Sequence, residues 1–237
     1  MALQPGNAQL NLTRRDALDM AATATMLASA FALMWILSRP SGPAQAKPSL
    51  PVPTAPLSLV GANLLGRPDA RASLVIFSDF ECPYCARFAR DVLPAIKARY
   101  VETGRLQLAF RHFPLEKHAD AMRLASLAEC GAKQDRFWAI HDALFANPSL
   151  ADGDVGLFEH PSTAGLSLDA YRACMSSDAT AADVAADRAI GAGLGISGTP
   201  SFFVGRLDGQ NVVVSSVFAG ARPIAEFDKA IGKEIGN

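Results

Sequence analysis

The alternation of apolar and polar positions predicts a strand–helix–strand unit that begins near residue 73. Residues 73–77 form a short apolar run with β-branched side chains, which suits a buried strand. Residues 87–100 carry apolar side chains at helical spacing, and Pro94 within this pattern should kink the helix. Residues 106–110 then alternate as a strand does. We therefore expect a βαβ unit with a right-handed crossover.

A long helical stretch follows this unit. Alanine is dense from Lys117 to about Gly195, and apolar side chains recur there every three or four residues. Turn signals interrupt the stretch at Asn147-Pro148, Asp152-Gly153 and Pro161. The pattern predicts several helices rather than one.

Strands return in the last part of the chain. Residues 201–204 and 212–218 predict an antiparallel hairpin, joined through Asp208-Gly209. Residues 223–235 place apolar side chains on one helical face. The order of elements predicts an α/β fold over residues 57–237, in which a helical domain is inserted into a small mixed-sheet domain.

The amino-terminal part has the character of a targeting segment. Residues 20–38 contain no charged side chain, and residues 26–37 are strongly apolar. Such a segment suits either a membrane-spanning helix or a signal peptide, so we expect residues 1–38 to be one of the two. Cleavage after Ala44-Gln45-Ala46 would leave Lys47 as the first mature residue.

Two further patterns surround that segment. Thr13-Arg14-Arg15-Asp16 has a weak likeness to a twin-arginine export signal, because the residues that follow lack the usual Phe and basic side chain. Residues 39–56 contain repeated prolines, which predict an extended, semi-rigid linker.

Composition excludes several classes of protein. Half of the 237 residues are hydrophobic and 19% are charged, so most of the chain has the composition of a folded domain rather than of disorder. A formal net charge of −1 leaves no basic surface for nucleic acid. Four cysteines are too few for a small disulfide scaffold.

Cys82 and Cys85 form a C-x-x-C pair at the junction of the predicted strand and helix. A zinc site needs four ligands, and Cys130 and Cys174 do not form a second such pair, so we expect no metal site. Unpaired N–H groups and the helix dipole stabilise a thiolate at a helix N-terminus, where Pro83 suits the first helical position. We expect Cys82 to be an exposed nucleophile and Cys85 a buried resolving thiol.

Four segments carry a resemblance to a known family. Residues 78–85, Ser-Asp-Phe-Glu-Cys-Pro-Tyr-Cys, resemble the active-site segment of the DsbA-like thiol–disulfide oxidoreductases, in the thioredoxin superfamily. Residues 198–205 resemble the cis-proline segment of that family. Residues 110–115, and Cys130 together with residues 137–141, resemble its strand end and helical insertion. The likeness covers about residues 57 to 235 and implies a thioredoxin fold with an inserted helical domain.

The resemblance also implies a substrate site. In this family the cis-proline loop lies beside the dithiol and binds an extended substrate chain, a role that falls here to Thr199 and Pro200. We assign Pro83 and Tyr84, between the two cysteines, to the same site. Many relatives carry a buried acid six residues before the first cysteine, where this chain has Ile76. Whether Asp79 or Glu81 on the turn replaces that acid stays open at this point.

Cys130 and Cys174 are the second cysteine pair. They are either buried free thiols or, in an oxidising compartment, a disulfide within the helical block. With Cys82 and Cys85 assigned to each other, this is the only pairing left, and we expect a structural cross-link, with a redox relay as the alternative.

The histidines and aromatic residues suggest no further chemistry. We expect satisfied surface or boundary roles for the histidines and a core position for Phe137 and Trp138. The histidines are His112, His118, His141 and His160.

The resemblance implies an extracytoplasmic enzyme that oxidises reduced exported proteins, in the periplasm or at the outer face of the cytoplasmic membrane. A substrate thiolate attacks the Cys82–Cys85 disulfide at Cys82, and a membrane redox partner re-oxidises the dithiol. No cofactor beyond this disulfide is expected. Two alternatives remain: an isomerase or reductase of the same fold acting on misoxidised proteins, and a non-catalytic thiol-based module that handles copper or acts as a chaperone.

Overall fold

The computed structural model describes residues 34–35, 50–147 and 165–236. The chain divides into two compact units, residues 1–47 and residues 48–237. The expected targeting segment, its cleavage site and the first part of the proline-rich linker lie outside the described residues, apart from Met34 and Trp35. Within the described residues, no helix combines the length and the apolar character needed to cross a membrane.

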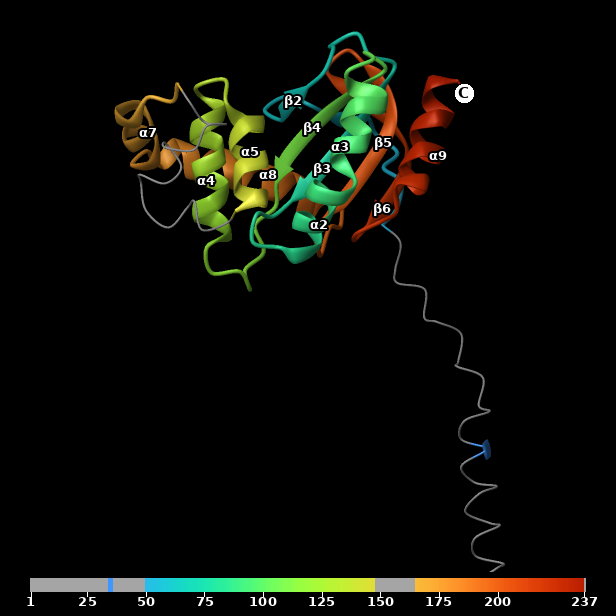
Figure 1. Cartoon of the computed structure of the whole chain (residues 1–237), viewed down its shortest axis with the longest axis horizontal. Coiled ribbons are helices and arrows are strands. Elements are labelled where there is room, and N and C mark those ends of the chain that lie inside the picture. Colours follow the sequence, from blue (N-terminus) through green and yellow to red (C-terminus); the bar gives the residue numbers. More distant parts are fainter. Residues whose placement is uncertain (1–33, 36–49, 148–164, 237) are drawn as a thin grey trace, which may run out of the picture. The chain divides into compact units, whose positions relative to one another are not determined.

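A mixed sheet forms the centre of the second unit (Figure 1). Among the described residues it has six strands in the order β1-β6-β5-β3-β4-β2. β3 and β4 pair in parallel, whereas the other neighbours are antiparallel. The strands are β1 Leu57–Ser58, β2 Asn63–Leu65, β3 Ala72–Ser78, β4 Leu106–His112, β5 Ser201–Asp208 and β6 Asn211–Ala219.

Four of these strands follow the predicted pattern, and two do not. β3 to β6 confirm the expected βαβ unit and the carboxy-terminal hairpin, each strand running a little further than predicted. β1 and β2 were not predicted. They have only two and three residues, too few to show an alternation, and pairing with β6 and β4 is what makes them strands.

The helix after β3 is divided into three parts. α2 runs Pro83–Asp91, α3 runs Leu93–Ile96, and a π-helical turn spans Lys97–Val101. Pro83 at the first helical position and the distortion at Pro94 are as predicted, whereas the helix expected over 87–100 extends back to Pro83 and is interrupted at Val92 rather than only kinked. Pro94 in the first turn of α3 has no N–H to donate, which accounts for the break at Val92.

Helices inserted between β4 and β5 confirm the helical insertion. Their bounds are α4 Ala121–Ala132, α5 Phe137–Ala146, α7 Leu168–Met175 and α8 Asp178–Gly193. Figure 1 shows α4, α5 and α7 grouped on the side of β4, and the closing helix α9, Ile224–Ile235, on the side of β5 and β6. α5 ends at the first expected turn signal, with Asn147 as its C-cap, whereas Pro148 and the signals at 152–153 and 161 lie outside the described residues.

The strand alternation divides the core between the two faces of the sheet. Leu74 and Ile76 of β3 pack with α2, α3 and α9 on one face. Val75 and Phe77 pack on the other face, against residues of β5, β6 and the segment after β4. A third cluster joins the insert to the start of α2 and includes both Cys82 and Cys85. The dithiol therefore lies where the insert meets the sheet domain.

Candidate functional site

Cys82 and Cys85 are held by a tight turn between β3 and α2. Cys82 has extended backbone angles just before α2 begins, and its N–H donates to the carbonyl of Asp79 (3.1 Å). Its own carbonyl accepts from Ala86 N–H (3.0 Å), the first bond of the helix. Pro83 occupies the first helical turn, where no N–H is required. This turn places Cys82 at the N-terminus of α2 and Cys85 in the first turn of that helix.

The Cys82 residue is less exposed than the sequence suggests. We expected an exposed nucleophile, but only 4% of Cys82 is accessible, and 1% of Cys85. The Thr199 loop covers Cys82, whose Sγ lies 3.4 Å from the Thr199 carbonyl oxygen, within reach for the protonated thiol to donate. Access to Cys82 is through a pocket rather than from an open surface.

The two thiols have opposite electrostatic environments. A hydrogen bond from the Cys85 thiol, together with main-chain N–H groups of Cys85 and Tyr84, lowers the pKa of Cys82 to about 5 against the effect of burial. Burial, and then the neighbouring Cys82 sulfur, raise the pKa of Cys85 well above its ordinary range. The pair therefore holds one thiolate and one thiol at neutral pH.

A cis peptide bond joins Thr199 to Pro200 beside the dithiol. The Pro200 carbonyl accepts from Gly220 N–H (2.7 Å), and Ser201 Oγ donates to the Gly198 carbonyl (2.8 Å). The buried Thr199 Oγ1 has no hydrogen-bond partner among the described residues. Because the Thr199 hydroxyl makes no hydrogen bond to Cys82 Sγ, we assign the low pKa of Cys82 to the Cys85 thiol and the main-chain N–H groups.

A pocket of about 830 Å³ opens beside Cys82. Its walls come from the active-site turn, the segment after β4, one side of α8 and the loop before Pro200. The Tyr84 side chain at its rim is exposed (54% for the residue). Cys82, Pro83, Tyr84 and Thr199, four of the six residues expected at the site, line this pocket, whereas Cys85 and Pro200 are not among its lining residues.

The pocket also contains a residue that the sequence analysis did not assign to it. His118 lines the pocket, and its Nδ1 lies 2.7 Å from Asp79 Oδ2. The two residues are 39 positions apart, so no local spacing relates them. Ile76, where relatives carry an acid, is buried among apolar side chains.

The expectation of surface or boundary histidines is wrong for His112 and His141, both of which are buried. His112 lies at the end of β4, next to Glu129 of α4, and His141 packs among aromatic rings of β4 and α5. The alternation of β4 is the sequence signal that places His112 in the core, and the helical spacing of α5 is the signal that places His141 there. His160 lies outside the described residues.

Phe137 is in the core as expected, but Trp138 is only partly buried and donates from Nε1 to the Leu64 carbonyl (2.9 Å).

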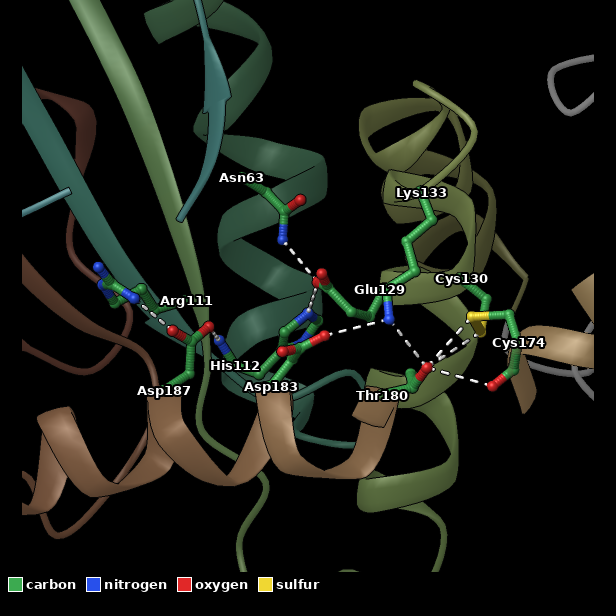
Figure 2. A network of polar contacts seen from close by, with 10 residues as sticks. All are labelled: Asn63, Arg111, His112, Glu129, Cys130, Lys133, Cys174, Thr180, Asp183 and Asp187. Atoms are coloured by element: carbon green, nitrogen blue, oxygen red, sulfur yellow. Dashed lines mark hydrogen bonds and ion pairs between the residues drawn. A yellow bond between two sulfur atoms is a disulfide. The ribbon is translucent and has the colours of Figure 1, made fainter. Parts of the chain in front are cut away.

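Cys130 and Cys174 form a disulfide between α4 and α7. Figure 2 shows Thr180, at the start of α8, beside it: Thr180 Oγ1 lies 3.2 Å from Cys174 Sγ, and Lys133 Nζ donates to Thr180 Oγ1 at 3.1 Å. Lys133 Nζ also pairs with Asp183 (3.1 Å). The disulfide is thus part of the packing between α4, α7 and α8.

The same view shows how α8 is fixed to the sheet (Figure 2). Asp187 pairs with the buried guanidinium of Arg111 and accepts from His112 N–H at 2.9 Å. Burial raises the pKa of Asp187, and the charge of Arg111 opposes that rise. His112 and Asn63 then bind Glu129, at 3.2 and 3.0 Å. This network orients α8, one side of which forms the pocket wall.

Among the described residues, no three His, Cys, Asp or Glu side chains gather in a group that could hold a metal ion.

Comparison with known proteins supports the likeness seen in the sequence. A thioredoxin family model matches residues 59–231. Disulfide bond formation protein D of Bacillus subtilis is 27% identical over 160 residues, which cover 62% of this chain and 69% of that protein. A protein of Salinispora tropica named Na(+)/H(+) antiporter NhaA 3 is 33% identical over 170 residues. The match covers 68% of this chain but only a quarter (25%) of that antiporter.

Solved structures show the same fold. Alpha-DsbA1 of Wolbachia pipientis superposes with a TM-score of 0.59 at 25% identity, covering 79% of this chain and 94% of that one. Oxidised BdbD of Bacillus subtilis gives a TM-score of 0.64 at 22% identity, covering 77% and 97%.

Proposed function

Since the chain belongs to the DsbA-like thiol–disulfide oxidoreductases of the thioredoxin family, we propose that it oxidises reduced exported proteins by dithiol–disulfide exchange at Cys82 and Cys85. The observation that carries this proposal is the contrast between the two thiols. Cys82, with its pKa lowered to about 5, is stabilised as a thiolate in the reduced protein. A reduced form stabilised in this way makes the disulfide a strong oxidant, which favours oxidation over reduction of substrates.

The reaction begins on the oxidised protein. A substrate thiolate attacks Cys82 Sγ, the Cys82–Cys85 bond breaks, and Cys85 leaves and takes up a proton. A second substrate thiolate attacks the substrate sulfur of the mixed disulfide and releases Cys82 as a thiolate. Because the pKa of Cys82 is low, Cys82 is the better leaving group, which favours release of an oxidised substrate.

The substrate chain is proposed to lie across the pocket beside the cis-proline loop. Thr199, Pro200, Pro83 and Tyr84 would contact it, and the unpartnered buried Thr199 Oγ1 offers a hydrogen bond. An exposed aromatic ring at the rim, Tyr84, suits contact with an unfolded chain.

Export is proposed on two grounds. The Cys130–Cys174 disulfide suits an oxidising compartment, and residues 20–38 suit a signal peptide or anchor. Residues 1–56 fused to a reporter that is active only outside the cytoplasm should give an active reporter, and an inactive one would overturn the localisation. The mass of the mature protein then decides between cleavage after Ala46 and a retained anchor. Turnover further requires a membrane redox partner that re-oxidises the dithiol.

The activity is tested with reduced, unfolded ribonuclease. The oxidised protein should restore ribonuclease activity, Cys82→Ser should abolish this, and Cys85→Ser should accumulate mixed disulfides with the substrate. A reduction potential of about −120 mV is expected for an oxidant, whereas a value of about −270 mV would indicate a reductase. Reactivation of scrambled rather than reduced ribonuclease would indicate an isomerase. If neither ribonuclease refolding nor insulin reduction is observed, the chain is a thiol-based binding module instead.

A further inference from the structure

The carboxylate of Asp79 joins two segments that build the site, the active-site turn and the segment after β4. Its Oδ1 accepts from Glu81 N–H at 2.8 Å, within the turn that leads to Cys82. Its Oδ2 accepts from Leu115 N–H at 2.9 Å and lies 2.7 Å from His118 Nδ1. The side chain is wholly buried. Asp79 therefore fixes the His118 ring relative to the turn that carries the dithiol.

His118 has a second ring nitrogen that the contact with Asp79 does not engage. Because Nδ1 contacts a carboxylate, this nitrogen carries the hydrogen, and Nε2 has a free lone pair in the neutral ring. No protein partner of Nε2 is found among the described residues. The side chain is 15% exposed and lines the same pocket as Cys82.

We propose that His118, oriented by Asp79, is the general base that accepts the proton of a substrate thiol as its sulfur attacks Cys82. This inference rests on the proposed function and adds a residue to it. The substrate S–H bond breaks, its proton goes to His118 Nε2, and the substrate sulfur bonds to Cys82 Sγ. The electron pair of the Cys82–Cys85 bond leaves on Cys85, which takes a proton from solvent, and His118 returns its proton to solvent.

The chemistry gives such a base a clear purpose. A cysteine thiol of ordinary pKa is only a few per cent thiolate at neutral pH, and the thiolate is the nucleophile. Ile76 leaves the position of the buried acid of many relatives apolar, and the carboxylate of the Asp79–His118 pair lies elsewhere, on the turn before Cys82. Asp79 is a positioning residue, because its carboxylate contacts His118 and not the reacting sulfurs.

The other charged groups around the pocket do not offer the same function. Glu116, in the segment after β4, forms an ion pair with Arg188 of α8 at 2.5 Å. Lys117 also lines the pocket, but an ammonium group has no lone pair for a proton. Glu81 binds the N–H of Asp120 at 2.8 Å, at the start of α4.

The test compares two thiols against the oxidised protein at neutral pH. N-acetylcysteine is mostly protonated, whereas pentafluorothiophenol is already ionised and needs no base. The His118→Gln variant should react about tenfold more slowly with N-acetylcysteine, because the remaining thiolate fraction of a few per cent limits the loss. Its rate with pentafluorothiophenol should stay within about twofold of wild type.

Further variants separate a proton-transfer role from a structural one. Asp79→Asn should show the same selective loss, and the double variant should lose no more than either single one. Asp120→Asn is the matched control, because it removes a carboxylate two residues from His118 that pairs with Arg123 and does not line the pocket. It should leave both rates unchanged.

Equal losses with the two thiols, or no loss with N-acetylcysteine, would overturn the proposal. Should His118→Gln fail to fold, His118→Asn replaces it. A series of alkyl thiols gives a further arm: the ratio of the wild-type rate to the variant rate should grow as the pKa of the thiol rises, because a more protonated thiol gains more from a base, and a constant ratio would contradict a general base. These rates need no protein substrate, so failure of ribonuclease oxidation alone would count against the proposed function and not against His118.

Discussion

The low pKa of Cys82 predicts how its reactivity responds when its main hydrogen-bond donor is removed. The Cys85 thiol is the largest single cause of the lowering to about 5. A hydrogen bond to a charged group contributes about 1.5–3 kcal/mol, and one pKa unit corresponds to about 1.4 kcal/mol. Cys85→Ala should therefore raise the pKa of Cys82 by about one to two units, to between about 6 and 7.

Alkylation of reduced protein by iodoacetamide measures this shift, because only the thiolate reacts. The wild-type alkylation rate should rise with pH, with a midpoint at about 5, and reach a plateau above it. In Cys85→Ala the midpoint should lie higher, and in Cys85→Ser, which keeps a hydroxyl donor, it should move less. Cys130 and Cys174 are in a disulfide and do not react. An unchanged midpoint in Cys85→Ala, or a wild-type midpoint above about 7, would refute the assignment of the low pKa to this donor.

Three further predictions concern the framework around the site. Replacing Cys130 and Cys174 together by Ala should lower the free energy of unfolding by about 2–4 kcal/mol while leaving oxidase turnover intact at low temperature; normal stability with lost turnover would indicate a redox relay instead. Arg111→Met should cost about 3–5 kcal/mol in chemical denaturation, because Asp187 would keep a buried, unpaired charge, and adding Asp187→Asn should recover part of that loss. Gly191→Ala should destabilise the fold by about 1–3 kcal/mol, because the new Cβ would lie 2.6 Å from the Phe113 ring. Gly193→Ala has open space around it and should be neutral or stabilising by up to about 1 kcal/mol. Equal melting temperatures for the two variants would contradict this packing.

Local pattern was enough to predict much of the fold. β3 was found because buried strands are apolar runs, β4 because its side chains alternate, and α9 because one of its faces is apolar. The βαβ order and the later hairpin then limited the topology, since crossovers are right-handed and neighbouring strands pair. The dithiol was found because its spacing and its place before a helix are both local features.

The sequence by itself determined the strand and helix pattern, the position of the dithiol and the candidate pairing of the other two cysteines, because each depends on neighbours along the chain or on a small set of cysteines. Only the tertiary structure decided how buried Cys82 is, since the covering Thr199 lies 117 residues away. It also decided the contact between Asp79 and His118, which lie 39 positions apart. Such contacts depend on how separate elements pack together, and the spacing of two residues along the chain does not tell how far apart they lie in the folded protein.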